Sequence, residues 1–163
     1  MDVLWAELTR GLGDTRQLMQ VIIRLIAAVL FGAIVGFERE RAGKPAGLRT
    51  HTLVCLGTTL FVVVCGGVGV TSDGVSRVIQ GVVTGIGFIG AGSILKVGEE
   101  KNVRGLTTAA AVWMTAAIGV SVGLGSIGIA GISTLLALII LWVVGAIEAR
   151  AEKKHGEVKH TKY

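Results

Sequence analysis

The stretch GFERERAGKPAGLRTH, residues 36–51, decides how the chain folds. It holds two glutamates, four arginine or lysine residues and a histidine, and an apolar run lies on each side of it. Each run is close to the roughly 20 residues that a helix needs to cross the hydrocarbon core of a bilayer. A charged turn between two such runs predicts a membrane-spanning helical hairpin that reverses direction at this stretch.

The rest of the chain has the same character. Hydrophobic residues make up 52% of the 163 residues and charged residues 17%, whereas soluble domains carry about a quarter charged residues. Its 25 glycines are also typical of membrane helices, where small residues let helices approach closely. We therefore predict an all-α integral membrane protein with five transmembrane helices, at about residues 18–37, 52–70, 78–97, 106–124 and 127–147.

The basic residues predict the orientation. Of 16 Lys and Arg residues, twelve fall in segments 38–50 and 96–104 and in the tail, three on the opposite side, and Arg24 inside the first span. Because basic residues accumulate in the cytoplasm, the N-terminus is expected outside and the C-terminus inside. We expect residues 1–147 to form one transmembrane domain with a short extracytoplasmic N-terminus and no cleavable signal peptide. Residues 148–163 would be a basic cytoplasmic tail, disordered or lying along the membrane, with no soluble domain attached.

A weak internal repeat relates the two halves of the chain. A shift of 58 residues places Gly32-Ala33 on Gly90-Ala91, and Gly47-Leu48-Arg49-Thr50 on Gly105-Leu106-Thr107-Thr108. Both copies read as a span, a charged loop, Gly-Leu-x-Thr and a returning span. This pattern predicts two helical hairpins in parallel orientation, related by an axis along the membrane normal.

The glycines of the third span invite two interpretations. Gly85, Gly87 and Gly90 match the dinucleotide-binding pattern G-x-G-x-x-G, but that pattern requires a strand before it, which a membrane span excludes. Small residues four apart instead indicate close helix packing. The alternative is a broken helix that lines a polar cavity. The candidate residues for packing or a cavity are Gly32, Gly36, Gly81, Gly85, Gly87, Gly90, Gly92 and Trp113.

Arg24 lies inside the first span. It is expected either to extend its charged end to the outer interface or to face the bundle, where it would need a partner. Asp73 is the nearest acidic residue on that side of the membrane.

The ends of the opening stretch carry the candidate binding site. Glu38 and Arg49 would pair across the turn, since a lone charge at the membrane boundary is costly. Thr50 and Thr108 have the composition of helix N-caps, and a helix N-terminus beside an arginine attracts anions. The predicted cytoplasmic-boundary site, for charge, an anion or a partner, comprises Glu38, Arg39, Arg49, Thr50, Arg104 and Thr108.

Several other residues carry a simpler expectation. Glu40, Glu99 and Glu100 have basic neighbours, so they are interpreted as solvated loop charges and not as ligands of a divalent cation. His51 is interpreted as an ordinary loop histidine, and Cys55 and Cys65 as free thiols. No sequence motif for a hydrolase, metalloprotease or zinc site is present. We therefore expect no catalytic residue, metal or cofactor, and no nucleic-acid partner.

Three segments together resemble the MgtC/SapB family of bacterial inner-membrane proteins: GFERERAGKPAGLRTHTLVCLG (36–57), RVIQGVVTGIGFIGAGSIL (77–95) and VRGLTTAAAVWMTAAIGVSVGLG (103–125). The resemblance implies five spans in the bacterial plasma membrane and a link to magnesium homeostasis, to growth at low magnesium and, in some members, to survival inside host cells. The family residues that this chain matches are Glu38, Arg39, Gly47, Arg49, Thr50, Arg77, Gln80, Gly85, Gly87, Gly90, Gly92, Arg104, Gly105, Thr108 and Trp113.

Two departures from the family limit what the resemblance implies. Some members continue into a soluble C-terminal domain, whereas this chain has the short form. Members implicated in virulence can carry a cysteine where this chain has Met114.

Two hypotheses about function follow. The first is a non-enzymatic regulator that acts on another membrane machine through helix contacts and cytoplasmic loops, in contact with the bilayer and with a second copy or another membrane protein. The second is a transporter or channel for a small ion or solute, with Mg²⁺ among the candidates. Few ionisable residues lie within the spans, which disfavours an ion pathway.

Overall fold

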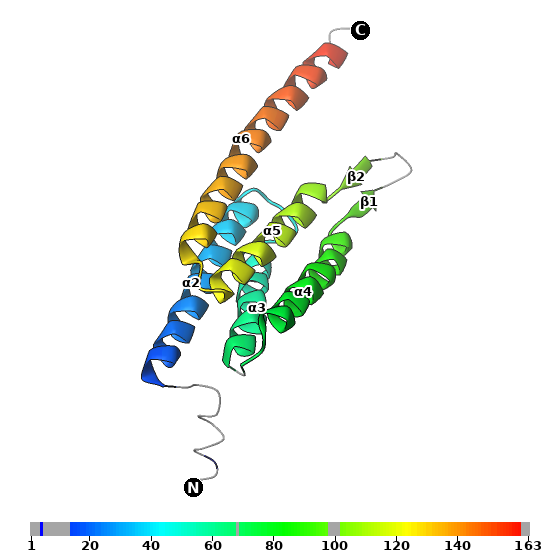
Figure 1. Cartoon of the computed structure of the whole chain (residues 1–163). Helices are drawn as coiled ribbons and strands as arrows, with labels where there is room; N and C mark the ends of the chain where they lie inside the picture. The colour runs from blue at the N-terminus through cyan, green and yellow to red at the C-terminus, as the bar shows by residue number, and fades with distance from the viewer. Residues whose placement is uncertain (1–3, 5–13, 68, 98–101, 161–163) are drawn as a thin grey trace.

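The computed structural model describes residues 4, 14–67, 69–97 and 102–160. Its elements, in chain order, are α2 (Thr15–Arg41), α3 (Leu48–Gly67), α4 (Ser72–Gly92), β1 (Leu95–Val97), β2 (Asn102–Arg104), α5 (Leu106–Gly123) and α6 (Ile127–His160) (Figure 1). In this part of the chain, five helices are long and apolar enough to cross a membrane. The prediction of an all-α protein with five transmembrane helices is confirmed.

Three helices begin earlier than predicted because side chains cap them. The Asp14 carboxylate accepts a hydrogen bond from the backbone N–H of Gln17, and α2 begins at Thr15 and not at residue 18. The Glu40 carboxylate accepts a hydrogen bond from the backbone N–H of Leu48 at 2.9 Å, so α3 begins there and not at residue 52. The Thr71 hydroxyl accepts one from the N–H of Gly74, and α4 begins at Ser72 and not at residue 78. Each cap satisfies an N–H group that the first helical turn leaves free.

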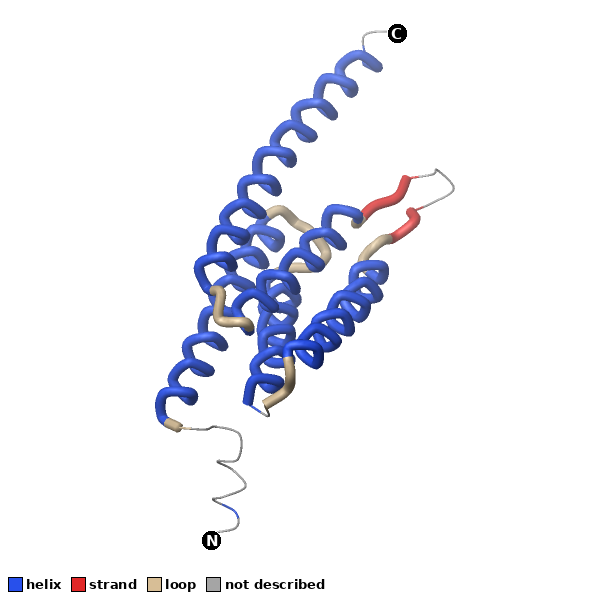
Figure 2. The backbone as a smooth tube through the Cα atoms, in the orientation of Figure 1, coloured by secondary structure: helices blue, strands red, loops and turns tan. Residues whose placement is uncertain are grey.

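The predicted third span ends too late. Helix α4 ends at Gly92, and Leu95–Val97 pairs antiparallel with Asn102–Arg104 in a short hairpin that the sequence pattern did not predict (Figure 2). Gly105 then leads into α5 with a φ of +97°, and a Cβ atom there would collide with the carbonyl oxygen of Ser93. Only glycine adopts this backbone conformation without strain. Glu99 and Glu100 lie outside the described residues.

The expectation of a disordered tail is wrong, whereas its position along the membrane stays a prediction. Helix α6 continues beyond residue 147 to His160 and carries most of the basic segment with it. The segment is rich in Ala, Glu and Lys, which are among the strongest helix formers.

The helices alternate in direction, so the two termini lie at opposite ends of the bundle (Figure 1). Helix α3 packs on α2, α4 and α5, and α6 packs on α2 and α5. The main hydrophobic core joins Ala28 and Val35 of α2 with Cys55 of α3 and Ile118 of α5.

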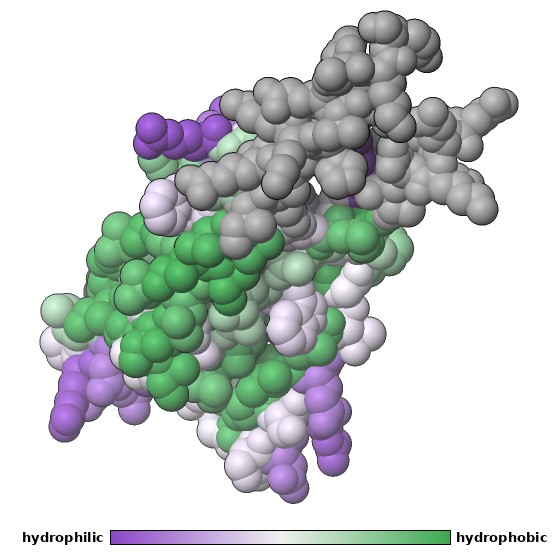
Figure 3. Space-filling view, turned by 90° about the horizontal axis from the view of Figure 1, so that it is seen from above, coloured by the Kyte–Doolittle hydropathy of each residue, from purple (hydrophilic) through white to green (hydrophobic). Residues whose placement is uncertain are grey.

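The outside of the bundle is apolar. Phe88 is 84% exposed and Trp142 is 75% exposed, together with many other large hydrophobic side chains. In Figure 3 hydrophobic residues form a broad area and hydrophilic residues lie at its margins. Apolar side chains exposed on helices long enough to span a membrane are in contact with lipid, so the protein is a multi-pass membrane protein in contact with the bilayer.

The two helical hairpins make equivalent contacts. A Cβ atom at Gly32 of α2 would lie 2.8 Å from the carbonyl oxygen of His51 in α3, and one at Gly90 of α4 would lie 3.6 Å from that of Ala109 in α5. Both residues of the first contact map onto the second by the same shift of 58 residues. This equivalence supports the predicted parallel repeat and shows that the second hairpin is more loosely packed.

Candidate functional site

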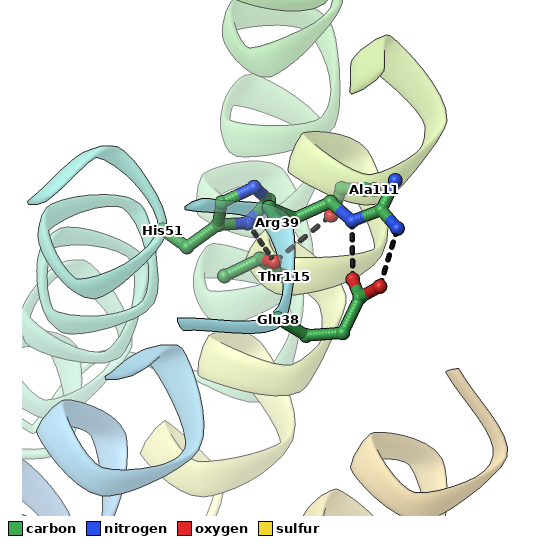
Figure 4. A network of polar contacts seen from close by, with 5 residues as sticks. All are labelled: Glu38, Arg39, His51, Ala111 and Thr115. Carbon is green, nitrogen blue, oxygen red and sulfur yellow. Dashed lines mark hydrogen bonds and ion pairs between the residues drawn. The ribbon is translucent and has the colours of Figure 1, made fainter. Parts of the chain in front are cut away.

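A buried polar cluster lies where α2, α3 and α5 meet, near the 42–47 loop (Figure 4). It is formed by Glu38 and Arg39 at the end of α2, His51 in the first turns of α3, and Thr115 in α5. Arg39 is 3% exposed, and His51 and Thr115 are fully buried. Such residues are rare in the interior of a small helical bundle unless they are paired.

The Arg39 guanidinium is held by its neighbour in the sequence. Its Nη2 atom donates to Glu38 Oε1 at 2.7 Å, and its Nε atom donates to Glu38 Oε2. A guanidinium and a carboxylate in this two-pronged arrangement satisfy two donors at once. The pair therefore brings a buried positive charge into the bundle with its counter-charge beside it.

His51 makes one side-chain hydrogen bond, through its Nδ1 atom. Its Nδ1 atom lies 2.7 Å from Thr115 Oγ1, and the Thr115 hydroxyl donates to the carbonyl oxygen of Ala111 at 2.9 Å. The donor in the contact between His51 and Thr115 is set by the tautomer of the histidine ring. Nε2 is buried and has no hydrogen-bond partner among the described residues.

The predicted ion pair between Glu38 and Arg49 is wrong, because Glu38 pairs with Arg39 and the Arg49 side chain is exposed. Thr50 is also not an N-cap: α3 begins at Leu48 and places Thr50 inside its first turn. Glu40 is exposed to solvent as predicted, but it lies in α2 and not in a loop, and its side chain caps α3.

In the second Gly-Leu-x-Thr motif, residues 105–108, the threonine is also not an N-cap. Thr108 lies inside the first turn of α5 and is 2% exposed, while Gly105 occupies the N-cap position without a side-chain hydrogen bond. Arg104 ends β2 and is exposed. The structure thus gathers Glu38 and Arg39 into the buried cluster, and leaves Arg49 and Arg104 on the surface.

Arg24 faces the bundle. Its Nη1 atom donates to the carbonyl oxygen of Gly123 at 2.9 Å, at the end of α5. The last carbonyl groups of a helix have no partner within the helix and carry partial negative charge, so a guanidinium is well suited to this place. The partner of Arg24 is therefore this helix end and not Asp73.

Four glycines bring the inner helices into close contact. A Cβ atom at Gly36 would lie 2.7 Å from Leu48 Cα, and one at Gly123 would lie 2.7 Å from Val62 Cβ. Gly32 and Gly119 are equally close to the backbone of α3. Each pair is spaced four residues apart on one face of its helix, which is the small-residue packing that membrane helices use.

The predicted packing residues of α4 are placed differently. A Cβ atom at Gly81, Gly85, Gly87 or Gly92 would have nothing within 4 Å, whereas Gly90 lies against Ala109. The predicted candidate Trp113 on α5 is 49% exposed. These four glycines therefore make no close helix contact within the described part of the chain, and their role as a packing surface or cavity stays a prediction.

Gly81 and Gly85 border a groove of about 620 Å³ between α3 and α4. Its lining is apolar apart from one threonine: Leu53, Val54, Gly57, Thr58, Phe61, Val78, Gly81, Val82, Gly85, Ile86 and Ile89. Helix α4 is otherwise little covered, with only Ile86 and Gly90 buried among its residues. No group of three or more His, Cys, Asp or Glu side chains in the described residues is arranged to hold a metal ion.

Sequence reasoning missed His51 and Thr115, and it interpreted His51 as a loop residue. The error follows from starting the second span at residue 52, which left His51 outside it. The signal available in the sequence is the spacing of His51 and Cys55, because residues four apart lie on one face of a helix. In the structure both residues are buried.

Fold and site together define a five-helix, multi-pass membrane protein with a glycine-packed centre, a buried charged cluster at one end and an open apolar groove on one side. The profile of the MgtC family matches residues 25–150. The chain belongs to the MgtC family.

Individual relatives agree. The chain is 44% identical to SrpB of Synechococcus elongatus over 129 residues, which cover 72% of this chain and 71% of SrpB. It is 42% identical over 149 residues to YhiD of Escherichia coli strain K12, provisionally described as a magnesium transporter, covering 87% of this chain and 68% of YhiD.

The chain is also 42% identical over 126 residues to MgtC of Salmonella typhimurium, covering 77% of this chain and 53% of that protein. It thus spans about half the length of that MgtC. No solved structure matches this chain.

Proposed function

We propose that this protein is a non-enzymatic regulator in the bacterial inner membrane, linked to magnesium homeostasis and to adaptation to low magnesium. It acts on another membrane protein, or on a second copy of itself, through helix contacts within the bilayer and through its cytoplasmic loops. Membership of the MgtC family and the magnesium-related description of YhiD support the link to magnesium. The accumulation of basic residues in the 38–50 and 96–104 segments and the tail supports a cytoplasmic position for that end of the bundle.

One observation carries the regulatory part of this proposal. Helix α4 has only two buried residues, and it borders an apolar groove that the rest of the described chain leaves open. The other inner contacts, between α2, α3 and α5, are closed by glycines at which an added Cβ atom would lie 2.8 Å or less from a neighbouring helix. A protein that works by contact with a partner helix needs one uncovered helix surface on a well-packed scaffold, and α4 supplies it.

Growth at limiting magnesium tests the proposal. A strain that lacks the gene is complemented with the wild-type protein, with Gly85→Leu, which fills the groove, or with Gly128→Leu on α6. Position 128 is exposed, and a Cβ atom there has nothing within 4 Å, so this variant is a matched control. We expect Gly85→Leu to lose complementation at normal protein abundance while Gly128→Leu keeps it. Equal growth of the two variants would contradict a role for the groove.

Transport of a small ion or solute, with Mg²⁺ as the leading candidate, is the second proposed function. The provisional description of YhiD as a magnesium transporter favours it. The buried cluster of Glu38, Arg39 and His51 also places ionisable groups inside the bundle, and such groups mark ion pathways in many membrane proteins. Measurement of magnesium flux separates the two functions.

A further inference from the structure

Helix α4 has an exposed face that carries polar side chains. The helix packs on α3 and α5 and lies at one margin of the bundle (Figure 1). The exposed face includes neither its buried residues, Ile86 and Gly90, nor the groove residue Gly85. We call this face the α4 seam, and its six residues, all exposed, are Asp73, Arg77, Gln80, Thr84, Gly87 and Ala91.

The α4 seam has the spacing of a helix–helix interface. Its residues follow one another at intervals of four, three, four, three and four positions. This alternation is that of the a and d positions of a coiled coil, which pack against a second helix. Most transmembrane helix bundles have the same left-handed crossing geometry. The seam is therefore arranged for contact with one more helix.

Gln80 shows that lipid alone does not suit the α4 seam. It lies eight positions after Ser72, the first residue of α4, which is about 12 Å along the helix axis. At this depth Gln80 is inside a hydrocarbon core of about 30 Å. The Thr84 hydroxyl donates to the Gln80 backbone carbonyl, and the Gln80 side chain makes no hydrogen bond with the described residues. An amide without a partner is unfavourable in hydrocarbon, so the seam requires a polar partner.

The polar groups of the α4 seam complement a second copy of the same seam. Two copies insert into the membrane in the same orientation, so a two-fold axis along the membrane normal brings identical residues to the same depth. A glutamine amide both donates and accepts, so two Gln80 side chains satisfy each other.

The charges at the outer end of the α4 seam are also self-complementary. Asp73 and Arg77 lie four positions apart, about one helical turn. In a two-fold pair of seams, Asp73 of each copy packs beside Arg77 of the other, because successive a and d positions interlock. Among the described residues the one ion pair joins Glu38 and Arg39, so neither charge of the seam is already paired there. One pairing of two copies therefore makes two reciprocal ion pairs.

We propose that the α4 seam is the interface of a two-fold homodimer. Gln80 of the two copies form hydrogen bonds with each other inside the membrane, and Asp73 and Arg77 form ion pairs at its outer end. At the inner end, Gly87 and Ala91 let the two helices approach closely, because a Cβ atom at Gly87 has nothing within 4 Å. This inference rests on the proposed regulatory function and identifies a second copy as the partner of α4.

Energy transfer between copies tests the interface. The full-length protein, labelled at its C-terminal end with a donor or an acceptor, is reconstituted in liposomes at a series of protein-to-lipid ratios. We expect Gln80→Leu and Gly87→Leu each to weaken dimerisation about tenfold, equivalent to about 1.4 kcal/mol. Two controls should leave dimerisation unchanged: Gly85→Leu, which changes the groove, and Gly128→Leu on α6, where a Cβ atom also has nothing within 4 Å.

Charge exchange separates contact between copies from contact within one helix. Asp73→Arg places two positive charges on the seam and Arg77→Glu places two negative charges, so each variant alone should dimerise less than the wild-type protein. A mixture of the two variants should recover energy transfer between them, because both ion pairs form again across the interface. An ion pair within one helix cannot produce this recovery. Circular dichroism verifies that each variant remains helical.

Three results would overturn the proposal. The first is energy transfer that Gln80→Leu and Gly87→Leu leave unchanged, and the second is a mixture of charge variants that does not recover. The third is a curved dependence of energy transfer on the acceptor fraction, which indicates more than two copies in one assembly. A linear dependence indicates a dimer and supports the proposal.

Failure of this inference can be told from failure of the proposed function. If copies do not associate but Gly85→Leu still abolishes growth at limiting magnesium, the regulatory role stands and the homodimer is wrong. If Gln80→Leu abolishes dimerisation and the strain grows like the wild type, the interface exists and regulation through a second copy is wrong.

Discussion

Substitution of Gly32 by alanine tests the close contact between α2 and α3. The added Cβ atom would lie 2.8 Å from the carbonyl oxygen of His51, 2.8 Å from Thr52 Cα and 2.9 Å from Cys55 Cβ. Carbon atoms in contact prefer about 3.5–4.0 Å, so α2 and α3 must separate by roughly 1 Å. Two of the three atoms belong to the backbone of a helix and cannot rotate away, unlike the end of a flexible side chain.

The cost can be estimated against a matched substitution. Overpacking of a well-packed interior costs about 1–3 kcal/mol. Gly81→Ala is the control, because its Cβ atom meets nothing within 4 Å. Both variants gain the same helix propensity, about 1 kcal/mol for glycine to alanine, so the difference between them isolates the steric cost. We expect Gly32→Ala to be less stable than Gly81→Ala by about 1–3 kcal/mol.

Unfolding of the two variants in mixed detergent micelles, with the denaturing detergent titrated, measures this difference. Unfolding of the two variants at the same detergent fraction, or greater stability of Gly32→Ala, would refute a steric cost at Gly32. Either result would mean that α2 and α3 are further apart in the membrane than the distances around Gly32 indicate.

Three further predictions concern hydrogen bonds, and each is measured as the free energy of unfolding in the same micelles. Arg24→Met removes the donor to the carbonyl oxygen of Gly123, and we expect a loss of about 1–3 kcal/mol because that oxygen loses its partner; an unchanged value would show that water replaces the guanidinium. Thr59→Val removes a fully buried donor, 2.8 Å from the carbonyl oxygen of Gly119, and should cost about 1 kcal/mol. The control Thr84→Val changes an exposed residue and should cost almost nothing. Equal losses in the two variants would show that burial of the Thr59 hydrogen bond does not matter. Glu40→Ala removes the cap of α3 and should cost about 1 kcal/mol, and no loss would show that the cap does not stabilise the helix.

The number and approximate position of the transmembrane helices could be predicted from the sequence, because they depend on the length of apolar runs and on the distribution of charge. All five spans were predicted, because long apolar runs separated by charged turns leave little choice in a bilayer. The close approach at Gly32 and Gly36 also followed from spacing alone. These features depend on the local sequence alone, so they can be predicted without the tertiary structure.

The site could be predicted only in part because it depends on which residues meet. Glu38 and Arg39 were identified, but Glu38 pairs with its sequence neighbour Arg39. Arg49, the predicted partner, lies in the first turn of α3 with its side chain exposed. His51 was missed because a distant carboxylate, Glu40, caps α3 and starts it before residue 52. A side chain eight residues upstream of the helix start is not part of a local capping pattern.

The glycines of α4 show a third limit. Their spacing is the same as that of the packed glycines in α2, yet Gly81 and Gly85 face an open groove. Sequence periodicity identifies a surface suited to a close neighbour, but whether the neighbour is in the same chain is decided by the topology. Helix α6 packs on α2 and α5, and no other described helix covers the groove between α3 and α4.

Magnesium flux into liposomes tests the central claim most directly. The purified protein is reconstituted with a magnesium-sensitive dye inside the vesicles, and the helical circular dichroism spectrum of the same vesicles verifies that the protein is folded. A regulator that acts through helix contacts should give the same flux as protein-free vesicles. Protein-dependent magnesium entry that Gly85→Leu abolishes and Gly128→Leu preserves would contradict the account and establish transport.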